Sequence, residues 1–171
     1  MEKRISHLVK SFDTPPVSLL IVDDEKTVLS SVAALFSSPL WSITTAATLG
    51  GARRALGRPA KPWHCWILDV ALGEHENGLE LLRIRPDFKF TIVLSGLQSM
   101  TISADAMKLG ATTVLDKNPD NFDALYNQAC LNAALAYLFT TVPDQYFSIF
   151  SHLASSVMTD IVQWTEKSCY S

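Results

Sequence analysis

Residues Leu19–Lys26, LLIVDDEK, give the strongest indication of the fold of this chain. The first four of them, 19–22, are aliphatic and show neither a helical nor an alternating period, which indicates a central strand of a parallel sheet, buried on both faces. Asp23 and Asp24 follow at the carboxyl end of this strand, where open α/β sheets place their ligands. The stretch therefore predicts an α/β fold with a site at that edge of the sheet.

Asp23 and Asp24 have two interpretations. Adjacent carboxylates repel one another unless a cation or a basic side chain lies between them, so the pair indicates a hard, oxygen-preferring ion such as Mg²⁺. The alternative is a structural role, in which either side chain caps the helix that is expected to begin near Glu25. The pair alone leaves both interpretations open.

Strands and helices alternate along the residues that follow. Apolar residues at helical spacing, ending at residues 37–39, predict a helix after the first strand. The further strands are expected at 41–47, 63–70, 90–96 and 112–117, and the further helices at 49–56, 79–85 and 99–109. Residues 71–78 are expected to form a loop in which Gly78 takes a tight position. Right-handed crossovers then place all the strands in one parallel sheet with helices on both faces.

Chemically matched side chains stand at the ends of these strands. Asp69 ends the third strand, Ser95 ends the fourth and Lys117 follows the fifth. Because the carboxyl ends of parallel strands share one edge of a sheet, we expect these side chains to meet Asp23 and Asp24 there. Such a convergence is harder to explain by helix capping than the acidic pair alone.

Four short motifs at the strand ends resemble those of a known family. VDD (22–24), ILD (67–69), LSG (94–96) and DK (116–117) occur in the order typical of response-regulator receiver domains of the CheY type. GLELL (78–82) and KLGA (108–111) extend the resemblance, which covers residues 18 to about 135. It implies a flavodoxin-like, doubly wound, five-stranded parallel sheet of order 2-1-3-4-5 with a C-terminal helical extension.

The resemblance also implies a function, that of a phospho-accepting receiver domain of a two-component response regulator. Asp69 would accept a phosphoryl group from a sensor histidine kinase or a phosphotransfer protein, while Lys117 and Ser95 contact the transferred group. Mg²⁺ would neutralise the charge that gathers there. Its implied ligands are Asp23, Asp24, Asp69 and the backbone carbonyl of Ala71. Such a chain signals through its C-terminal helices and is not an enzyme.

The chain departs from the pattern of that family at several positions. Val114 stands three residues before the lysine, where the family usually has an aromatic residue that reports activation. Asn118 follows Lys117 and the proline is displaced to Pro119, so a cis peptide bond after the lysine is not expected. Gly73 stands near the usual proline of its loop. The acids, hydroxyl and lysine are intact, so we expect phosphorylation, but with these departures we do not predict the usual conformational response.

Two alternatives to a phosphorylated receiver come from other functional classes. A phosphohydrolase on a related α/β fold would use Asp69 as its nucleophile, but such enzymes usually carry a second acid two residues later, where this chain has Ala71. A pseudo-receiver would keep the fold and bind a partner without phosphate. The complete set of acids, hydroxyl and lysine argues against that alternative.

Composition limits the partners and the cellular compartment that we expect for this chain. A net charge of −3 offers no basic footprint for nucleic acid, so direct nucleic-acid binding is not expected. Cys65, Cys130 and Cys169 are odd in number and widely spaced, which disfavours a disulfide framework and fits a reducing cytoplasm. His64 adjoins Cys65 on a strand, where side chains alternate, so the two cannot share a metal and His64 is expected to pack. No segment predicts export or membrane insertion, so we expect a cytoplasmic protein without membrane contact.

The expected organisation has three parts, namely an N-terminal arm (1–17), a receiver domain (18–140) and a helical extension (141–171). Residues 129–139 are apolar apart from Asn132, so this helix must be buried on more than one side. Two uses of the C-terminal helices stay open. They pack on their own receiver, or they form a homodimer interface, which we favour slightly because a long exposed apolar face is a liability.

Overall fold

The computed structural model describes residues 16–57, 62–73, 76–85, 88, 90–96 and 100–141. Most of the expected arm and extension lies outside these residues, and the three-part organisation therefore stays a prediction. Residues 1–133 form one compact unit, and residues 134–171 form a second. The first unit contains the sheet and all the residues expected at the site.

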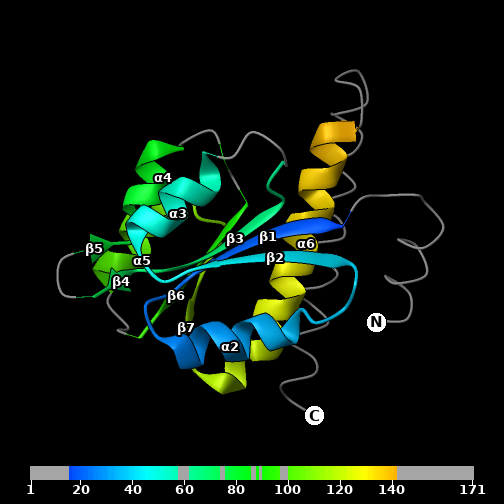
Figure 1. Ribbon diagram of the computed structural model, residues 1–171. Helices are drawn as coiled ribbons and strands as arrows, with labels where there is room; N and C mark the ends of the chain where they lie inside the picture. The colour runs from blue at the N-terminus through cyan, green and yellow to red at the C-terminus, as the bar shows by residue number, and fades with distance from the viewer. Residues whose placement is uncertain are drawn as a thin grey trace, which may run out of the picture. The chain divides into compact units, whose positions relative to one another are not determined.

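Five parallel strands form the sheet of the first unit (Figure 1). They are β1 (Val17–Val22), β2 (Trp41–Ala46), β3 (Cys65–Asp69), β6 (Thr91–Ser95) and β7 (Thr113–Asp116). Their spatial order is β2-β1-β3-β6-β7, which is 2-1-3-4-5 when only the strands of this sheet are counted. The predicted flavodoxin-like, doubly wound fold is confirmed.

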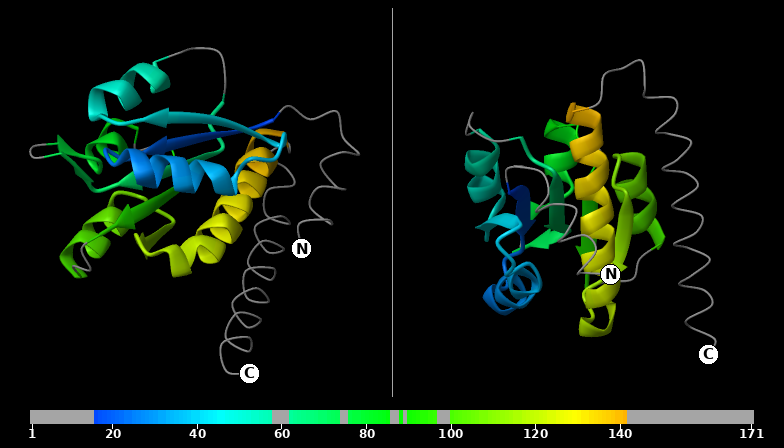
Figure 2. Two further views of the ribbon diagram at one scale, coloured as in Figure 1. Left: turned by 60° about the horizontal axis from the view of Figure 1, so that its bottom comes forward. Right: turned by 90° about the vertical axis from the view of Figure 1, so that its right-hand side faces the viewer.

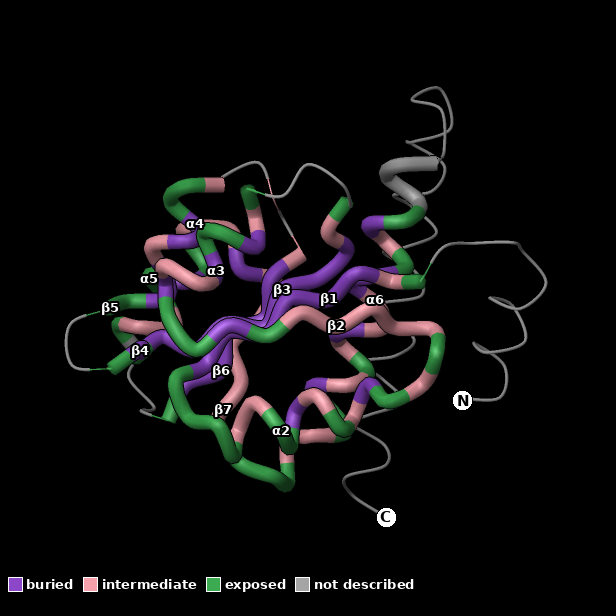
Figure 3. The backbone as a smooth tube through the Cα atoms, in the orientation of Figure 1, coloured by how far each residue is buried: buried purple, intermediate pink, exposed green. Residues whose placement is uncertain are grey.

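Helices cover both faces of the sheet (Figure 2). One face packs against α2 (Lys26–Leu35) and the first part of α6 (Phe122–Thr141), and the other against α3 (Leu49–Leu56), α4 (Glu80–Ile84) and α5 (Met100–Lys108). Leu20 and Val22 of β1 face one layer, while Leu19 and Ile21 face the other, and all four are buried. This explains the unbroken apolar run of β1. Figure 3 shows the buried strands in the middle of the sheet. None of the described helices is long and apolar enough to cross a membrane.

Asn132, the polar residue in the apolar run of α6, is fully buried, and its side chain is hydrogen-bonded. Its Nδ2 group donates to Thr112 Oγ1 at 2.9 Å, and its Oδ1 atom accepts from Gln128 at 3.1 Å. Thr112 Oγ1 donates in turn to the carbonyl of Thr91 at 2.7 Å. A buried polar group without partners would cost about 1–3 kcal/mol. These bonds therefore favour one position of α6 against the sheet.

His64 is buried and has a packing role, as predicted. Its backbone N–H donates to the carbonyl of Ser18 at 3.0 Å, and its Nδ1 atom accepts from the N–H of Ser18 at 3.0 Å. Burial lowers the pKa of His64, which favours the neutral imidazole that can accept this bond. The side chain thus satisfies a backbone donor at the start of the sheet.

Residues 71–78 were expected to be a loop, but they contain an antiparallel hairpin of β4 (Ala71–Leu72) and β5 (Glu76–Asn77). Glu and Asn are poor strand formers, so local propensity did not predict it. Distant residues bind the hairpin instead. Asp24 Oδ2 accepts from the N–H of Gly73 at 3.0 Å, and Glu76 Oε2 accepts from the N–H of Leu49, at the start of α3, at 2.8 Å.

Gly78 takes the tight position predicted for it, because an added Cβ atom would overlap the carbonyl oxygen of Asp69. We expect Gly78→Ala to lower the free energy of unfolding by about 1–3 kcal/mol, since backbone must move to make room. Gly50→Ala in α3 is the control, because its Cβ atom would meet only the end of the Arg54 side chain, at 3.7 Å. This control should be neutral or stabilising. Urea denaturation measures both, and equal stabilities would contradict the close approach.

Candidate functional site

Parallel pairing brings the predicted residues to one edge of the sheet. The register pairs Val22 with Leu68 and Asp69 with Leu94, so β1, β3 and β6 end side by side. It also pairs Ser95 with Asp116, one residue before the lysine. The side chains that follow or end these strands therefore gather at a common carboxyl edge, as the sequence predicted.

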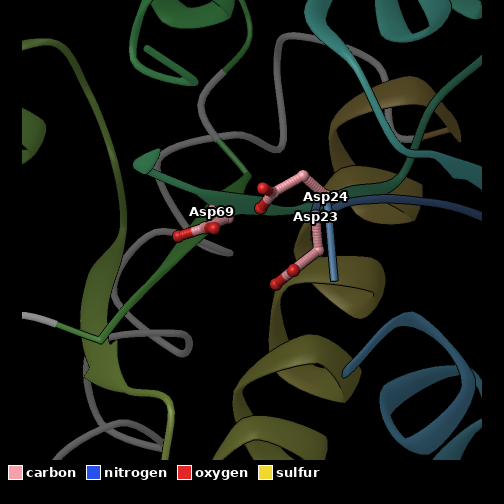
Figure 4. A group of neighbouring side chains, drawn as sticks. All are labelled: Asp23, Asp24 and Asp69. Atoms are coloured by element: carbon pink, nitrogen blue, oxygen red, sulfur yellow. The ribbon is translucent and has the colours of Figure 1, made fainter. Parts of the chain in front are cut away.

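Three carboxylates form the centre of the site (Figure 4). Asp23, Asp24 and Asp69 each offer an oxygen, and these oxygens lie within 4.8 Å of one another. Asp23 and Asp69 are buried, whereas Asp24 is exposed to solvent. A cluster of carboxylate oxygens with one open side is the kind of donor set that hard divalent cations prefer.

Lys117 reaches this centre from the end of β7. Its Nζ atom lies 2.6 Å from Asp69 Oδ2 and 2.9 Å from Asp23 Oδ2. A third acid, Glu25, approaches the same atom at 3.4 Å. The ammonium group therefore bridges the two buried carboxylates, and it is itself only 10% exposed.

Burial and neighbouring charges shift the pKa values of Asp23, Asp69 and Lys117, and the two effects act in opposite directions. Burial raises the pKa of Asp23 and of Asp69 above the ordinary value, and the hydrogen bonds with Lys117 offset this only in part. Burial also opposes the charge of Lys117, but the two carboxylates outweigh it and raise the pKa of the lysine. Lys117 therefore stays protonated at neutral pH, and the buried carboxylates gain from any further positive charge.

Ser95 and Ala71 lie next to this centre. Ser95 ends β6 and is buried, and its carbonyl accepts from the N–H of Lys117 at 3.0 Å. The N–H of Ala71 donates to Asp69 Oδ1 at 3.3 Å, and Ala71 is exposed. The structure thus brings Asp23, Asp69 and Lys117 into direct contact and places Ser95 on the adjacent strand.

Helix capping does not account for the acidic pair. The N-cap of α2 is Glu25, whose side chain makes no capping hydrogen bond. Asp23 Oδ1 accepts from the N–H of Glu25 at 2.9 Å, one residue before the helix begins. Asp24 binds the β4–β5 hairpin through Gly73. Both carboxylates therefore face the site and its loops.

The positions that depart from the receiver pattern have ordinary structural roles. Val114 pairs with Val93 and packs against the core beside α5. The side chain of Asn118 accepts from the N–H of Asp120 and begins the short helix η1 (Pro119–Asn121). No cis peptide bond occurs in the described part of the chain.

Two contacts at the site were not predicted from the sequence. Glu25 touches Lys117, and Gly73 donates its N–H to Asp24. Glu25 directly follows the acidic pair, which is a usable signal for a place at the site, although it also stands where a helix is expected to begin. Gly73 gave no such signal, because its partner lies 49 residues away.

Comparison with known proteins supports the family suggested by the motifs. No protein-family model matches the chain. The acid tolerance regulatory protein ActR of Sinorhizobium medicae (strain WSM419) is 33% identical over 114 residues, which cover 65% of this chain and 57% of ActR. The chain therefore spans little more than half the length of this curated relative.

Solved structures share the fold. A CheY-like response regulator receiver domain protein from Methanospirillum hungatei JF-1 has a TM-score of 0.57 at 24% identity, covering 69% of this chain and 97% of that one. A Burkholderia pseudomallei response regulator, crystallised with a phosphorylated aspartic acid, a calcium ion and citrate, has a TM-score of 0.58 at 22% identity, covering 82% and 85%.

The sequence match, the strand order and the acidic cluster with its lysine agree with one another. They confirm the resemblance on which the predictions from the sequence were based. The chain belongs to the CheY-like family of response-regulator receiver domains of two-component systems, whose members are signalling domains rather than catalytic enzymes.

Proposed function

We propose that this chain accepts a phosphoryl group on Asp69 from a sensor histidine kinase or a phosphotransfer protein. The observation that carries the proposal is the contact of Lys117 Nζ with both Asp69 and Asp23 at the carboxyl edge of the sheet. The phosphorylated aspartic acid in the Burkholderia pseudomallei response regulator supports it by similarity of fold.

In the proposed transfer, an Asp69 carboxylate oxygen attacks phosphorus. The new oxygen–phosphorus bond forms as the bond between phosphorus and the donor breaks, and the donor keeps the electron pair. Lys117 then shifts its hydrogen bond from the carboxylate to a phosphoryl oxygen, as a compact cation that needs no fixed fork geometry. The hydroxyl of Ser95 donates a hydrogen bond to another phosphoryl oxygen. These contacts offset the charge that gathers at the acceptor.

The donor set of the site fits Mg²⁺. Asp23, Asp24 and Asp69 supply carboxylate oxygens, and we assign the backbone carbonyl of Ala71 as a further ligand. When bound, the ion supplies positive charge beside Asp23 and Asp69. The raised pKa values of these two buried acids indicate that Lys117 offsets their negative charge only in part. The calcium ion in the Burkholderia pseudomallei structure is consistent with a divalent cation here.

Signalling is proposed to pass to the C-terminal helices in a cytoplasmic protein that does not itself bind nucleic acid. α6 leads directly into residues 142–171, which lie outside the described residues. Neither alternative function has an observation in its favour. Ala71 provides no second acid for a hydrolase, and the acids and lysine that a pseudo-receiver would not need are in contact.

Acetyl phosphate tests the acceptor. We expect the wild-type chain to gain one phosphoryl group in the presence of Mg²⁺, and Asp69→Asn to gain none, because it lacks the attacking carboxylate. Asp105→Asn, an exposed residue of α5, is the control and should behave as wild type. Intact-mass spectrometry measures the product. Equal modification of Asp69→Asn would exclude this acceptor, and continuous phosphate release would favour the hydrolase.

Removing one buried charge should stabilise the chain when no metal is present. We expect Asp69→Asn to raise the free energy of unfolding at neutral pH by about 0.5–2 kcal/mol, because it removes a buried negative charge that Lys117 offsets only in part. Functional sites often carry such a penalty in stability. The pKa of Asp69 is raised in the folded state, so protonation relieves the same penalty in the wild type. The gain should therefore shrink as the pH falls through that raised value toward 3.8.

Urea denaturation with a chelator, at neutral and mildly acidic pH, measures this difference. Saturating Mg²⁺ should reverse the order, because an ion at 100 times its Kd stabilises the folded state by about 2.7 kcal/mol. The control is again Asp105→Asn. An Asp69→Asn variant less stable than wild type without metal would refute the stored penalty, and no stabilisation by Mg²⁺ would refute the metal site.

We also propose that the full chain forms a homodimer, which light scattering tests. We expect a mass of two chains, because apolar residues recur at helical spacing in the sequence from Tyr146 to Trp164, and a long apolar face without a partner would be a liability. Replacing Val157 with Glu should then lower the mass to that of one chain, whereas replacing the exposed Lys108 of α5 with Glu should not. A single-chain mass at all practical concentrations would favour packing of the extension on its own receiver.

A further inference from the structure

Glu25 is the third carboxylate on Lys117, and it differs from the other two in its exposure. The side chains of Asp23 and Asp69 are 2% and 3% exposed, whereas that of Glu25 is 59% exposed. Its Oε1 atom lies 3.4 Å from Lys117 Nζ. Glu25 therefore approaches the ammonium group from the solvent side of the site.

The backbone holds Glu25 in this place. Its N–H donates to Asp23 Oδ1 at 2.9 Å, and the residue is the N-cap of α2. The side chain does not cap the helix and is left to reach Lys117. The backbone of Glu25 is thus fixed beside the site, and its exposed carboxylate lies within reach of Lys117.

A phosphoryl donor must come from solvent, because Asp69 is almost fully buried. On its way it meets the exposed carboxylates of Asp24 and Glu25. Asp24 belongs to the metal donor set, where a cation offsets its charge, but Glu25 does not. The charge of Glu25 therefore acts on an incoming anion directly, and it also competes for Lys117.

We propose that Glu25 is a specificity-determining residue that slows phosphorylation by small donors in proportion to their negative charge. This inference rests on the proposed function of the site. At about 6 Å in water, one unit charge repels a dianion enough to slow it about tenfold, and screening at about 0.1 M salt reduces this to about threefold. A monoanion is slowed about two- to threefold.

The competing explanation is an exposed ion pair without function, since such pairs contribute little. It predicts that loss of the Glu25 carboxylate changes neither the rates nor their ratio. A general disturbance of the site predicts equal changes for all donors. Only the proposal predicts that the change in rate depends on the charge of the donor, so a comparison of donors distinguishes it from both explanations.

The test compares acetyl phosphate, a dianion, with phosphoramidate, which carries less negative charge. Acetate leaves the first and ammonia the second as phosphorus bonds to Asp69. For Glu25→Gln we expect the acetyl phosphate rate to rise about three- to tenfold and the phosphoramidate rate about two- to threefold. Both effects should shrink in 1 M salt, where the screening length is about 3 Å.

Three matched measurements complete the experiment. Glu25→Asp keeps the charge and should retain the donor ratio of the wild type, while Asp105→Asn removes an exposed charge on α5 and should also leave it unchanged. Mg²⁺ titration without any donor should show about three- to tenfold weaker binding by Glu25→Gln, because one negative charge near a divalent cation is lost. Circular dichroism of each variant reports folding.

The outcomes distinguish this inference from the function on which it rests. If neither donor modifies the wild-type chain, the proposed function fails, and the role of Glu25 fails with it. If the wild type is modified but Glu25→Gln leaves the donor ratio unchanged, or Asp105→Asn changes it equally, only the role of Glu25 is refuted.

Discussion

The contact of the Lys117 ammonium group with the carboxylates of Asp69 and Asp23 is the interaction on which the site depends. Burying an ion costs several kcal/mol unless a partner of opposite charge offsets it. Here one cation bridges two buried anions, and the raised pKa values of both acids indicate that it offsets them only in part. The site therefore gains from added positive charge, which is the property that a metal-assisted phosphoryl acceptor needs.

The parallel sheet makes this contact possible. Its strands end at one edge, and the helices on both faces keep β1, β3 and β6 buried, so backbone pairing holds the three chain segments in register. The close approach of Gly78 to the carbonyl of Asp69 and the bond from Gly73 to Asp24 tie the loop after β3 to the same edge. A second bond, from Leu49 to Glu76, connects that loop to the start of α3.

Polar groups away from the site are satisfied in a different way. Asn132 and His64 are both buried, yet each has a hydrogen-bond partner on another segment of the first unit. Such groups add little net stability, but they penalise any arrangement in which their partners are lost. The position of the first part of α6, residues 122–133, beside Thr112 is thus specified by hydrogen bonds as well as by apolar packing.

The sequence was sufficient to predict the fold and the gathering of acids and a lysine at one edge of the sheet. Unbroken apolar runs such as residues 19–22 and the acids and lysine at strand ends are local signals, and parallel strands necessarily bring their carboxyl ends together. The β4–β5 hairpin, the partner of Asn132 and the place of Glu25 beside Lys117 became visible only in the folded chain. The hairpin and these side-chain contacts depend on residues tens of positions apart, so local propensity cannot predict them.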